Sequence, residues 1–305
     1  MPAMKDGGVQ IDLARIARNA EQIRQSTGVA VHAVVKANAY GLGIQRVARA
    51  LADIVQGFCV FALDEAREAD LWRLGGKPIL AIGPPEVARV EEYRAAHVRP
   101  AVSTVEQAKR LREVGPVLSV DTGMQRFACP PERLVEVLAA GECGEAFTHA
   151  VRPEQARRLV ELLGGKGLTL HAAGSALLDD PSCWLDAVRP GLALYRGAVT
   201  ITAPLVEVRE SRGPAGYTGF VVPRHGVILR GYSHGLRPGP CVINGRRSRV
   251  IEVGMQSSFV ETESGDKIGD AVTILGGGLE AEEIAPAWKC SPQQVLVGML
   301  KSHGK

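Results

Sequence analysis

One lysine stands where the sequence could give it unusual chemistry. Lys36 ends an apolar run, Val29–Lys36, that reads as a strand, and Tyr40 and two glycines follow before a helical pattern begins at Ile44. A lysine amine that leaves bulk water has a lowered pKa and becomes a nucleophile toward an aldehyde. A solvated lysine at a strand end fits the same short motif, so the surrounding residues must decide between the two.

Other residues that could bind an anion or move a proton also follow apolar runs. These stretches are Asp121–Arg126, Phe147–His149, His171–Ser175 and Arg189–Gly191. Taken singly, each has a structural explanation, such as a hydrogen-bonded histidine, a turn or a surface ion pair. If the ends of these runs meet in the fold, the same residues form one site.

Eight short apolar runs alternate with amphipathic helical patterns from Val29 to about Gly197. The runs are Val29–Lys36, Phe58–Leu63, Pro78–Gly83, Val98–Ser103, Pro116–Asp121, Ala146–Ala150, Gly167–Ala173 and Leu185–Gly191. Helical patterns cover Asp12–Gln25, Asp64–Leu74, Pro85–Ala96 and Pro153–Leu163, and Ser103 to Glu106 has the spacing of a capping box. The alternation predicts an α/β fold, a closed (β/α)8 barrel of the TIM type. An open sheet would usually carry Gly-x-Gly-x-x-Gly after its first strand, and this sequence has none there.

The sequence changes character after Gly197. Short β-rich runs are separated by turns, and Asn244-Gly245 is a strong hairpin signal. Further strands are predicted at Ser248–Gly254, Ser258–Glu261 and Ala271–Leu275, with a helix at Ala281–Trp288. We therefore expect two domains, a barrel over residues 1–197 and a small, mostly β C-terminal domain over residues 198–305.

Composition argues against several classes of protein. The 305 residues carry a net charge of +3 with no basic run, which argues against nucleic acid as a partner. No apolar stretch approaches the roughly 20 residues that span a bilayer, and the first residues lack a signal-peptide core. The six cysteines have no Cys-x-x-Cys spacing, so we expect reduced thiols, no metal site and a cytoplasmic location.

The motifs resemble, in the same order, those of the alanine racemases, barrel enzymes that depend on pyridoxal 5′-phosphate. The stretches that carry the resemblance are Val34–Gly43, Asp121–Arg126, Phe147–His149, His171–Ser175, Val188–Tyr195, Gly216–Gly219, Gly231–Gly235, Val253–Met255 and Lys267–Gly276. The resemblance runs from about Ile11 to Leu300, and its lysine and Arg-Pro-Gly motifs are the most specific. It implies a racemase or epimerase that interconverts L- and D-amino acids, with pyridoxal 5′-phosphate as its cofactor.

The resemblance also implies catalytic roles. Lys36 would bind the aldehyde of the cofactor and act as one acid/base. Tyr217 would be the second acid/base, reaching in from the partner subunit of a head-to-tail homodimer. Racemisation needs two such groups on opposite faces of the α-carbon, because one removes a proton and the other returns one from behind.

Further residues would bind the cofactor and the substrate. Arg189 would face the pyridine nitrogen, and because arginine only donates hydrogen bonds, that nitrogen would stay unprotonated. The ring is then a weaker electron sink, which favours proton exchange over decarboxylation. By the same resemblance, the cofactor would also contact Tyr40, Arg126, His149, Gly174, Ser175, Gly191 and Leu192, and the substrate would contact Arg126, Tyr232 and Met255.

Several positions depart from the family pattern. Leu42 stands for a histidine, Ser119 for a lysine, Gly174 for an asparagine, Gln256 for an aspartate and Gln293 for a tyrosine. These changes leave the cofactor chemistry intact but fall partly on positions that face the substrate. The expected substrate is therefore alanine or a related amino acid.

Two alternatives remain open. A decarboxylase or lyase on the same barrel is disfavoured by Arg189 and by the lack of a Cys/His pair in the C-terminal region. A non-catalytic, pyridoxal-phosphate-binding regulatory protein would resemble the barrel alone, and the β-rich region with Tyr217 argues against it.

Overall fold

Eight parallel strands close into a barrel, which confirms the TIM-type fold predicted from the alternating pattern. The computed structural model describes residues 8–301 of the chain. The barrel strands are β2 (Ala30–Val34), β3 (Gly57–Val60), β4 (Ile79–Ala81), β5 (Val98–Val102), β6 (Val117–Ser119), β7 (Glu145–Ala150), β8 (Thr169–Ala173) and β9 (Ala187–Val188). Each strand overlaps its predicted run. Pairing of β9 with β2, where Ala187 lies opposite Ala30, closes the ring.

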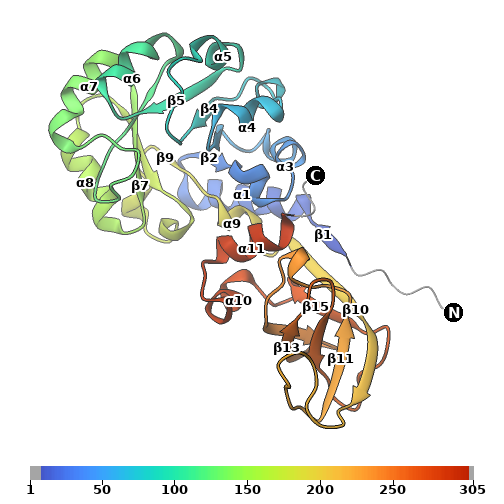
Figure 1. The fold of residues 1–305 in the computed structure, drawn as a ribbon. Coiled ribbons are helices and arrows are strands. Elements are labelled where there is room, and N and C mark those ends of the chain that lie inside the picture. The colour runs from blue at the N-terminus through green and yellow to red at the C-terminus, as the bar shows by residue number, and fades with distance from the viewer. Residues whose placement is uncertain (1–7, 302–305) are drawn as a thin grey trace. The chain divides into compact units, whose positions relative to one another are not determined.

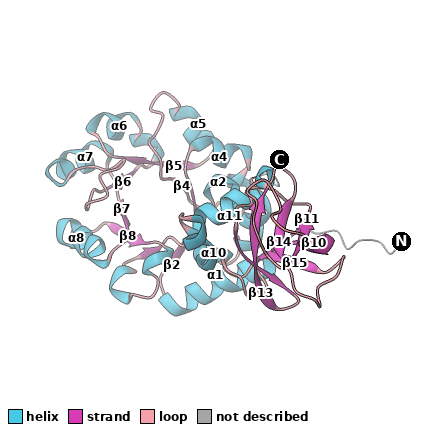
Figure 2. Ribbon diagram, turned by 60° about the horizontal axis from the view of Figure 1, so that its bottom comes forward, coloured by secondary structure: helices cyan, strands magenta, loops and turns pink. Residues whose placement is uncertain are grey.

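Helices form an outer layer around these strands (Figures 1 and 2). They are α1 (Leu13–Thr27), α3 (Ile44–Leu51), α4 (Leu63–Glu68), α5 (Val90–Ala95), α6 (Val105–Arg110), α7 (Leu134–Gly141) and α8 (Pro153–Leu163), with 3₁₀ turns η1 (Leu71–Arg73), η2 (Arg112–Val114), η3 (Pro131–Arg133) and η5 (Pro181–Cys183). In α8, proline starts the helix, and Ala156, Leu159 and Leu163 recur on one buried face. This spacing gives α8 one apolar face, which packs against β7 and β8.

Several local predictions in the barrel differ from the structure, and two of them concern where a helix starts. The helix cap is Thr104, one residue later than predicted, and its side chain accepts from the Gln107 N–H. The Gln107 side chain accepts from the Ser103 N–H, so the predicted capping box does not form. The helix predicted from Pro85 begins only at Val90. The Glu86 N–H donates instead to the Tyr93 hydroxyl, so this stretch folds back against the helix that follows it.

The C-terminal β region is a sheet of antiparallel strands. They are β1 (Val9–Ile11), β10 (Val199–Glu210), β11 (Arg224–Ile228), β12 (Gly239–Ile243), β13 (Arg246–Val253), β14 (Ser258–Glu261) and β15 (Ala271–Leu275). Their order is β1-β10-β11-β14-β13-β12-β15, and β10 also pairs with β15. The predicted hairpin joins β12 to β13, and Asn244 and Gly245 both have the positive φ that a two-residue turn requires.

Several elements were not predicted, and two of them lie near the ends of the chain. The short strand β1 pairs with β10, so residues near the start of the chain join the C-terminal sheet. Helix α11 (Pro292–Leu300) follows α10 (Ala281–Trp288), and Ser291 caps its first turn. Contacts divide the chain into two units. The barrel unit contains residues 16–39 and 43–194, and the β-rich unit contains the residues up to Arg15, the segment Tyr40–Leu42 and the chain from Tyr195 onward. Within residues 8–301, no helix combines the length and apolar character needed to cross a membrane.

Candidate active site

Lys36 follows β2 at the carboxyl end of the barrel's first strand and begins a left-handed turn. The segment α2 (Lys36–Tyr40) contains positive φ angles of 53° to 57° at Ala37, Asn38, Ala39 and Tyr40. This conformation costs roughly 1–2 kcal/mol for each L-residue, so tertiary contacts must hold it. One such contact is the Asn38 Oδ1 atom, which accepts from the Ile44 N–H at 2.8 Å and ties the turn to α3.

A carboxylate that the sequence did not reveal supports this turn. Glu65, on α4, accepts from the Ala37 N–H at 2.8 Å and from the Phe61 N–H at 2.6 Å. It therefore joins the residue after Lys36 to the loop that follows β3. Because both partners are backbone groups that only the fold brings together, no sequence motif could have identified Glu65.

The environment of Lys36 favours its neutral amine. Burial lowers the pKa of Lys36, the charges of Arg126 and Arg189 lower it further, and Glu65 acts in the opposite direction. A lowered pKa makes more of the amine available as a nucleophile and as a base at neutral pH.

Arg189 lies deep in the barrel, after β9, and is 5% exposed. Its Nη2 donates to the carbonyl oxygens of Thr148 and Ala172, and its guanidinium carbon lies 4.6 Å from the centre of the Phe147 ring. The buried Nε finds no hydrogen-bond partner within residues 8–301. Burial lowers the pKa of Arg189, yet an arginine keeps its charge in proteins. The site therefore holds, close to Lys36, a charged guanidinium group with one hydrogen-bond donor that has no partner.

His149, near the carboxyl end of β7, and Arg126, in the loop after β6, lie at the same end of the barrel. Loss of water around the ring, and then the charges of Arg189, Arg126 and Lys36, lower the pKa of His149 to about 4, although the residue stays more than a third exposed. The histidine is therefore neutral at pH 7. Asp121 Oδ1 accepts from the Gly123 and Gln125 N–H groups and so shapes the loop that carries Arg126.

The loops after β8 and β9 meet through Ser175. Its Oγ accepts from the Gly191 N–H at 2.9 Å and from the Ala193 N–H at 3.1 Å. Ser175 begins the 3₁₀ turn η4 (Ser175–Leu177), and Leu192 begins the short helix α9 (Leu192–Tyr195). Gly174 is close as well, since a Cβ placed on it would lie 3.7 Å from the carbonyl oxygen of Arg189. These are the loops in which barrel enzymes often bind a phosphate.

Tyr40 belongs to the β-rich unit, where its ring packs against Tyr195 with 4.9 Å between ring centres. Burial raises the pKa of Tyr40 to about 12, so its hydroxyl stays protonated and can donate a hydrogen bond.

Tyr217 lies in a loop of the β-rich unit and is 90% exposed. The loop itself is firmly held, because buried Glu252 accepts from the Tyr217 N–H at 2.8 Å and from the Thr218 N–H at 2.7 Å. Loss of water opposes ionisation of Glu252, but hydrogen bonds from Thr218 and Tyr217 outweigh it and lower its pKa. The loop therefore presents an aromatic hydroxyl to the surroundings on a fixed backbone. Glu252, like Glu65, carries no motif that sequence inspection would detect.

Tyr232 and Met255 lie beside the Tyr217 loop. The Tyr232 N–H donates to the Gly254 carbonyl oxygen at 2.9 Å, and a Cβ on Gly254 would lie 3.8 Å from the Tyr217 ring. Tyr232 begins the turn η6 (Tyr232–His234). The three predicted residues thus gather on one part of the β-rich unit, and all three side chains are exposed.

The predicted residues therefore form two groups. The barrel unit holds Lys36, Arg126, His149, Gly174, Ser175, Arg189, Gly191 and Leu192, and the β-rich unit holds Tyr40, Tyr217, Tyr232 and Met255. Within the barrel group the dominant charge is positive, and backbone N–H groups lie beside it.

The sequence matches the family model of the alanine racemase N-terminal domain over residues 11–199. The chain belongs to the alanine racemase family. This family member is 29% identical, over 350 aligned residues, to the biosynthetic alanine racemase of Escherichia coli K12, and the match covers 96% of each chain. The alanine racemase of Shigella dysenteriae serotype 1 is similar to the same extent, at 29% identity over 96% of each chain.

Solved structures of alanine racemases share the fold of this family member. The biosynthetic enzyme from Pseudomonas aeruginosa has a TM-score of 0.88 at 24% identity, with 97% of each chain covered. An alanine racemase from Bartonella henselae with covalently bound pyridoxal phosphate has a TM-score of 0.85 at 21% identity, covering 96% of this chain and 97% of the other. At these identities the likeness concerns the fold.

Proposed function

We propose that this chain is a pyridoxal-phosphate-dependent amino-acid racemase, acting on alanine or a related amino acid. The observation that carries the proposal is Lys36, an amine of lowered pKa held on a strained turn at the barrel mouth, with Arg126 and Arg189 as its charged neighbours. Membership of the alanine racemase family supports the reaction class.

The residues present fit pyridoxal phosphate. Its aldehyde needs a neutral amine, its phosphate needs cations and N–H donors, and its pyridine nitrogen needs one donor. Lys36 offers an amine whose pKa is lowered. The Gly191 and Ala193 N–H groups, here bonded to Ser175 Oγ, lie in the loops where barrel enzymes often bind a phosphate. The unpartnered Nε marks Arg189 as a buried donor with unused capacity. We expect Gly174, Gly191, Leu192 and Tyr40 to complete the phosphate site, and His149 to lie against the ring.

The bound cofactor supplies an electron-withdrawing ring that makes the α-hydrogen of an attached amino acid acidic. The Lys36 Nζ atom would take that hydrogen as a proton on one face or return it. Arg189 donates but never accepts, so it would hold the ring nitrogen unprotonated and would limit electron withdrawal. This weaker withdrawal is why we favour a racemase over a decarboxylase.

Tyr217 is our proposed second acid/base, supplied by the partner subunit of a head-to-tail homodimer. Its 90% exposure on an anchored loop suits a side chain that functions in another copy of the chain. We expect Tyr232 and Met255 to contact the substrate beside it, with Arg126 binding the substrate carboxylate. All six cysteines are unpaired, which suits the cytoplasmic location that we propose.

The test uses purified protein supplied with pyridoxal phosphate. We expect a visible absorbance band that Lys36→Ala abolishes, whereas Lys166→Ala, at an exposed lysine, retains it. We also expect deuterium from solvent to enter the α-position of L-alanine or a related L-amino acid as the D-enantiomer appears. Release of carbon dioxide would replace the proposal with a decarboxylase, and absence of exchange across a broad panel of amino acids would favour a binding protein.

A further inference from the structure

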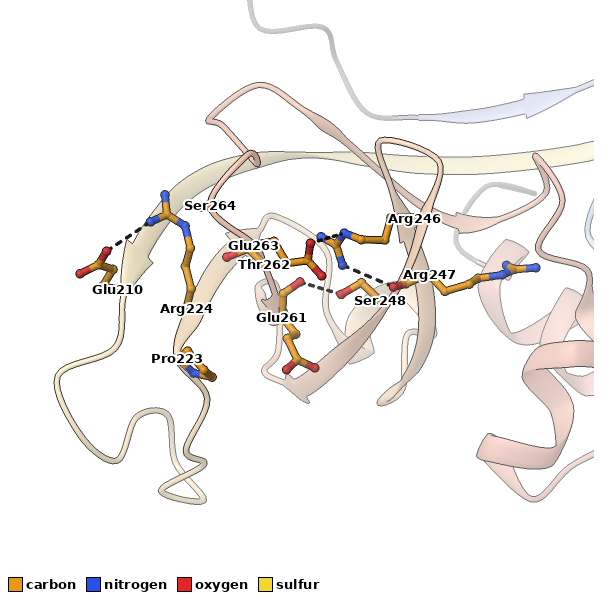
Figure 3. A pocket seen from close by; sticks show the side chains of 10 residues that line it. All are labelled: Glu210, Pro223, Arg224, Arg246, Arg247, Ser248, Glu261, Thr262, Glu263 and Ser264. Atoms are coloured by element: carbon orange, nitrogen blue, oxygen red, sulfur yellow. Dashed lines mark hydrogen bonds and ion pairs between the residues drawn. The ribbon is translucent and has the colours of Figure 1, made fainter.

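The β-rich unit contains a pocket of about 670 Å³ that none of the proposed catalytic or cofactor-binding residues line (Figure 3). It lies where the ends of β10, β11, β13 and β14 meet. We propose that this pocket binds a small zwitterion of the amino-acid class. The ligand carboxylate is held by Arg224 and Thr262, and its ammonium group by Glu210.

Arg224 is the arginine of this pocket with the weakest partner. Its nearest carboxylate is Glu210, at 3.9 Å, which is too long for a hydrogen bond. Arg246, by contrast, is paired to Asp266 at 2.7 Å, and Arg247 to Glu283 at 2.8 Å. Arg224 therefore retains donors for an incoming carboxylate, and Glu210 retains acceptors for an ammonium group.

Two buried polar atoms of the pocket lining lack partners within the described chain, Arg224 Nε and Thr262 Oγ1. Thr262 is only 4% exposed, and its N–H donates to the Arg224 carbonyl oxygen, so the two residues lie side by side on neighbouring strands. An unsatisfied buried polar group costs about 1–3 kcal/mol, and such groups are uncommon in folded proteins. Two adjacent ones in the lining of one pocket indicate a ligand that accepts hydrogen bonds.

The charge of the lining selects the ligand class. A guanidinium matches the two oxygens of a carboxylate. Three arginines and three glutamates line the same pocket, so its charge is balanced and suits a ligand of no net charge better than a dianion such as phosphate. Glu261 and Glu263 are already paired with Arg249 and Arg246, which leaves Glu210 to attract an ammonium group. A ligand that carries both charges can enter between Arg224 and Glu210 and satisfy each of them. The volume lies within the range of about 300–1,000 Å³ that is typical of small-molecule sites.

The experiment titrates the full-length Lys36→Ala protein with glycine, so that no reaction at the candidate active site contributes. Amide resonances of Arg224 and Thr262 should shift on addition of glycine, and acetate should bind at least about tenfold more weakly, because it lacks the ammonium group. Arg224→Ala and Arg224→Lys should each weaken glycine binding about tenfold or more. The exposed Arg212→Ala is the matched control and should bind glycine normally.

Thr262→Val separates a ligand contact from a structural role. Valine keeps the shape and removes an unpartnered hydroxyl, so the melting temperature should stay the same or rise while glycine binding weakens about fivefold. Equal binding of acetate and glycine, tighter binding of inorganic phosphate, or unchanged binding in both Arg224 variants would overturn the proposal. None of these results depends on whether the chain is a racemase.

Discussion

The turn that carries Lys36 is the most strained backbone in the barrel unit. Four successive residues without a glycine have left-handed φ angles, and hydrogen bonds accepted by the Glu65 and Asn38 side chains hold the turn in place. Strain of this kind persists only where the surroundings fix it, and it commonly marks functional positions. Its effect here is to fix the direction in which the lysine leaves the strand.

Ala37→Gly tests whether the strained turn holds Lys36 in the position that turnover requires. Glycine adopts positive φ without penalty, so the free energy of unfolding should not fall and can rise by about 1 kcal/mol. Turnover should drop, because Lys36 is held less firmly. Ala139→Gly, at an exposed position in α7, should instead cost about 1 kcal/mol and leave turnover unchanged. Urea unfolding with initial rates measures both quantities, and a loss of stability in Ala37→Gly would show that the turn is not strained.

Glu65→Gln should move the pKa of Lys36 downward. The carboxylate stabilises the ammonium form of Lys36, so its removal leaves the neutral amine at a lower pH. Glutamine has one acceptor oxygen, so one of the two hydrogen bonds that Glu65 accepts, from Ala37 or from Phe61, is lost as well, at a cost of about 1 kcal/mol. The pH dependence of pyridoxal phosphate attachment to the apoprotein is the measurement. Glu68→Gln, exposed on the same helix, is the control, and an unmoved midpoint in Glu65→Gln would limit Glu65 to a structural role.

Side chains from separate barrel strands also form a buried charged network. Glu145 on β7 is hydrogen-bonded to His171 on β8 at 2.8 Å and ion-paired to Arg99 on β5. His32 on β2 lies beside them, with 5.5 Å between its ring centre and that of His171. Ligand-type atoms of the two histidines and Glu145 lie within 4.8 Å of one another. Because Glu145 already has a cation and a hydrogen-bond donor, we interpret the cluster as an internal support of the barrel.

This network should make stability depend on pH. Burial alone would raise the pKa of Glu145, but His171 and Arg99 outweigh it and lower the pKa to about 2. Burial lowers the pKa of His171 to about 3. Both folded values lie below the ordinary ones, so the unfolded chain binds more protons, and the free energy of unfolding falls as the pH decreases from about 6.5 toward 3. A free energy of unfolding that rises over this range would contradict the assignment.

Removing the charge tests the same network at pH 7. Glu145→Gln should lower the free energy of unfolding by about 3 kcal/mol, because it leaves buried partners uncompensated. The matched control, Glu136→Gln, breaks an exposed ion pair with Arg133 and should change stability by less than about 1 kcal/mol. Urea unfolding measures the free energy of unfolding of both variants. Equal losses of this free energy would mean that the buried position of Glu145 makes its charge no more important for stability than that of Glu136.

Elements with a clear period could be predicted from the sequence, and contacts that depend on the fold could not. The barrel strands follow apolar runs, and β14, β15 and α10 match their predicted bounds. β1 has only three residues, too few for a periodic signal, and it forms because β10 offers an unpaired edge. The predicted barrel residues do lie at one mouth, but Glu65 and Glu252 bind backbone groups and so leave no pattern in the sequence.

At the scale of the whole molecule, the proposed homodimer makes a prediction about mixed subunits. Lys36→Ala and Tyr217→Phe should each abolish racemisation as homodimers. A hybrid of the two has one site in which Lys36 and the partner subunit's Tyr217 are both intact, so random mixing should restore about a quarter of the wild-type activity. Racemisation assays after dissociation and reassociation measure this. Continued inactivity of the mixture would mean that both residues act within one subunit.

The pairing of β1 with β10 has a consequence for how the chain is made on the ribosome. Residues 9–11 emerge early, but their hydrogen-bonding partner is synthesised only after every strand of the barrel. The barrel can therefore fold on the ribosome while β1 is still unpaired, and the β-rich unit is completed last. A separately produced fragment that starts after the barrel would lack β1, so we expect it to need that strand supplied, for example by circular permutation.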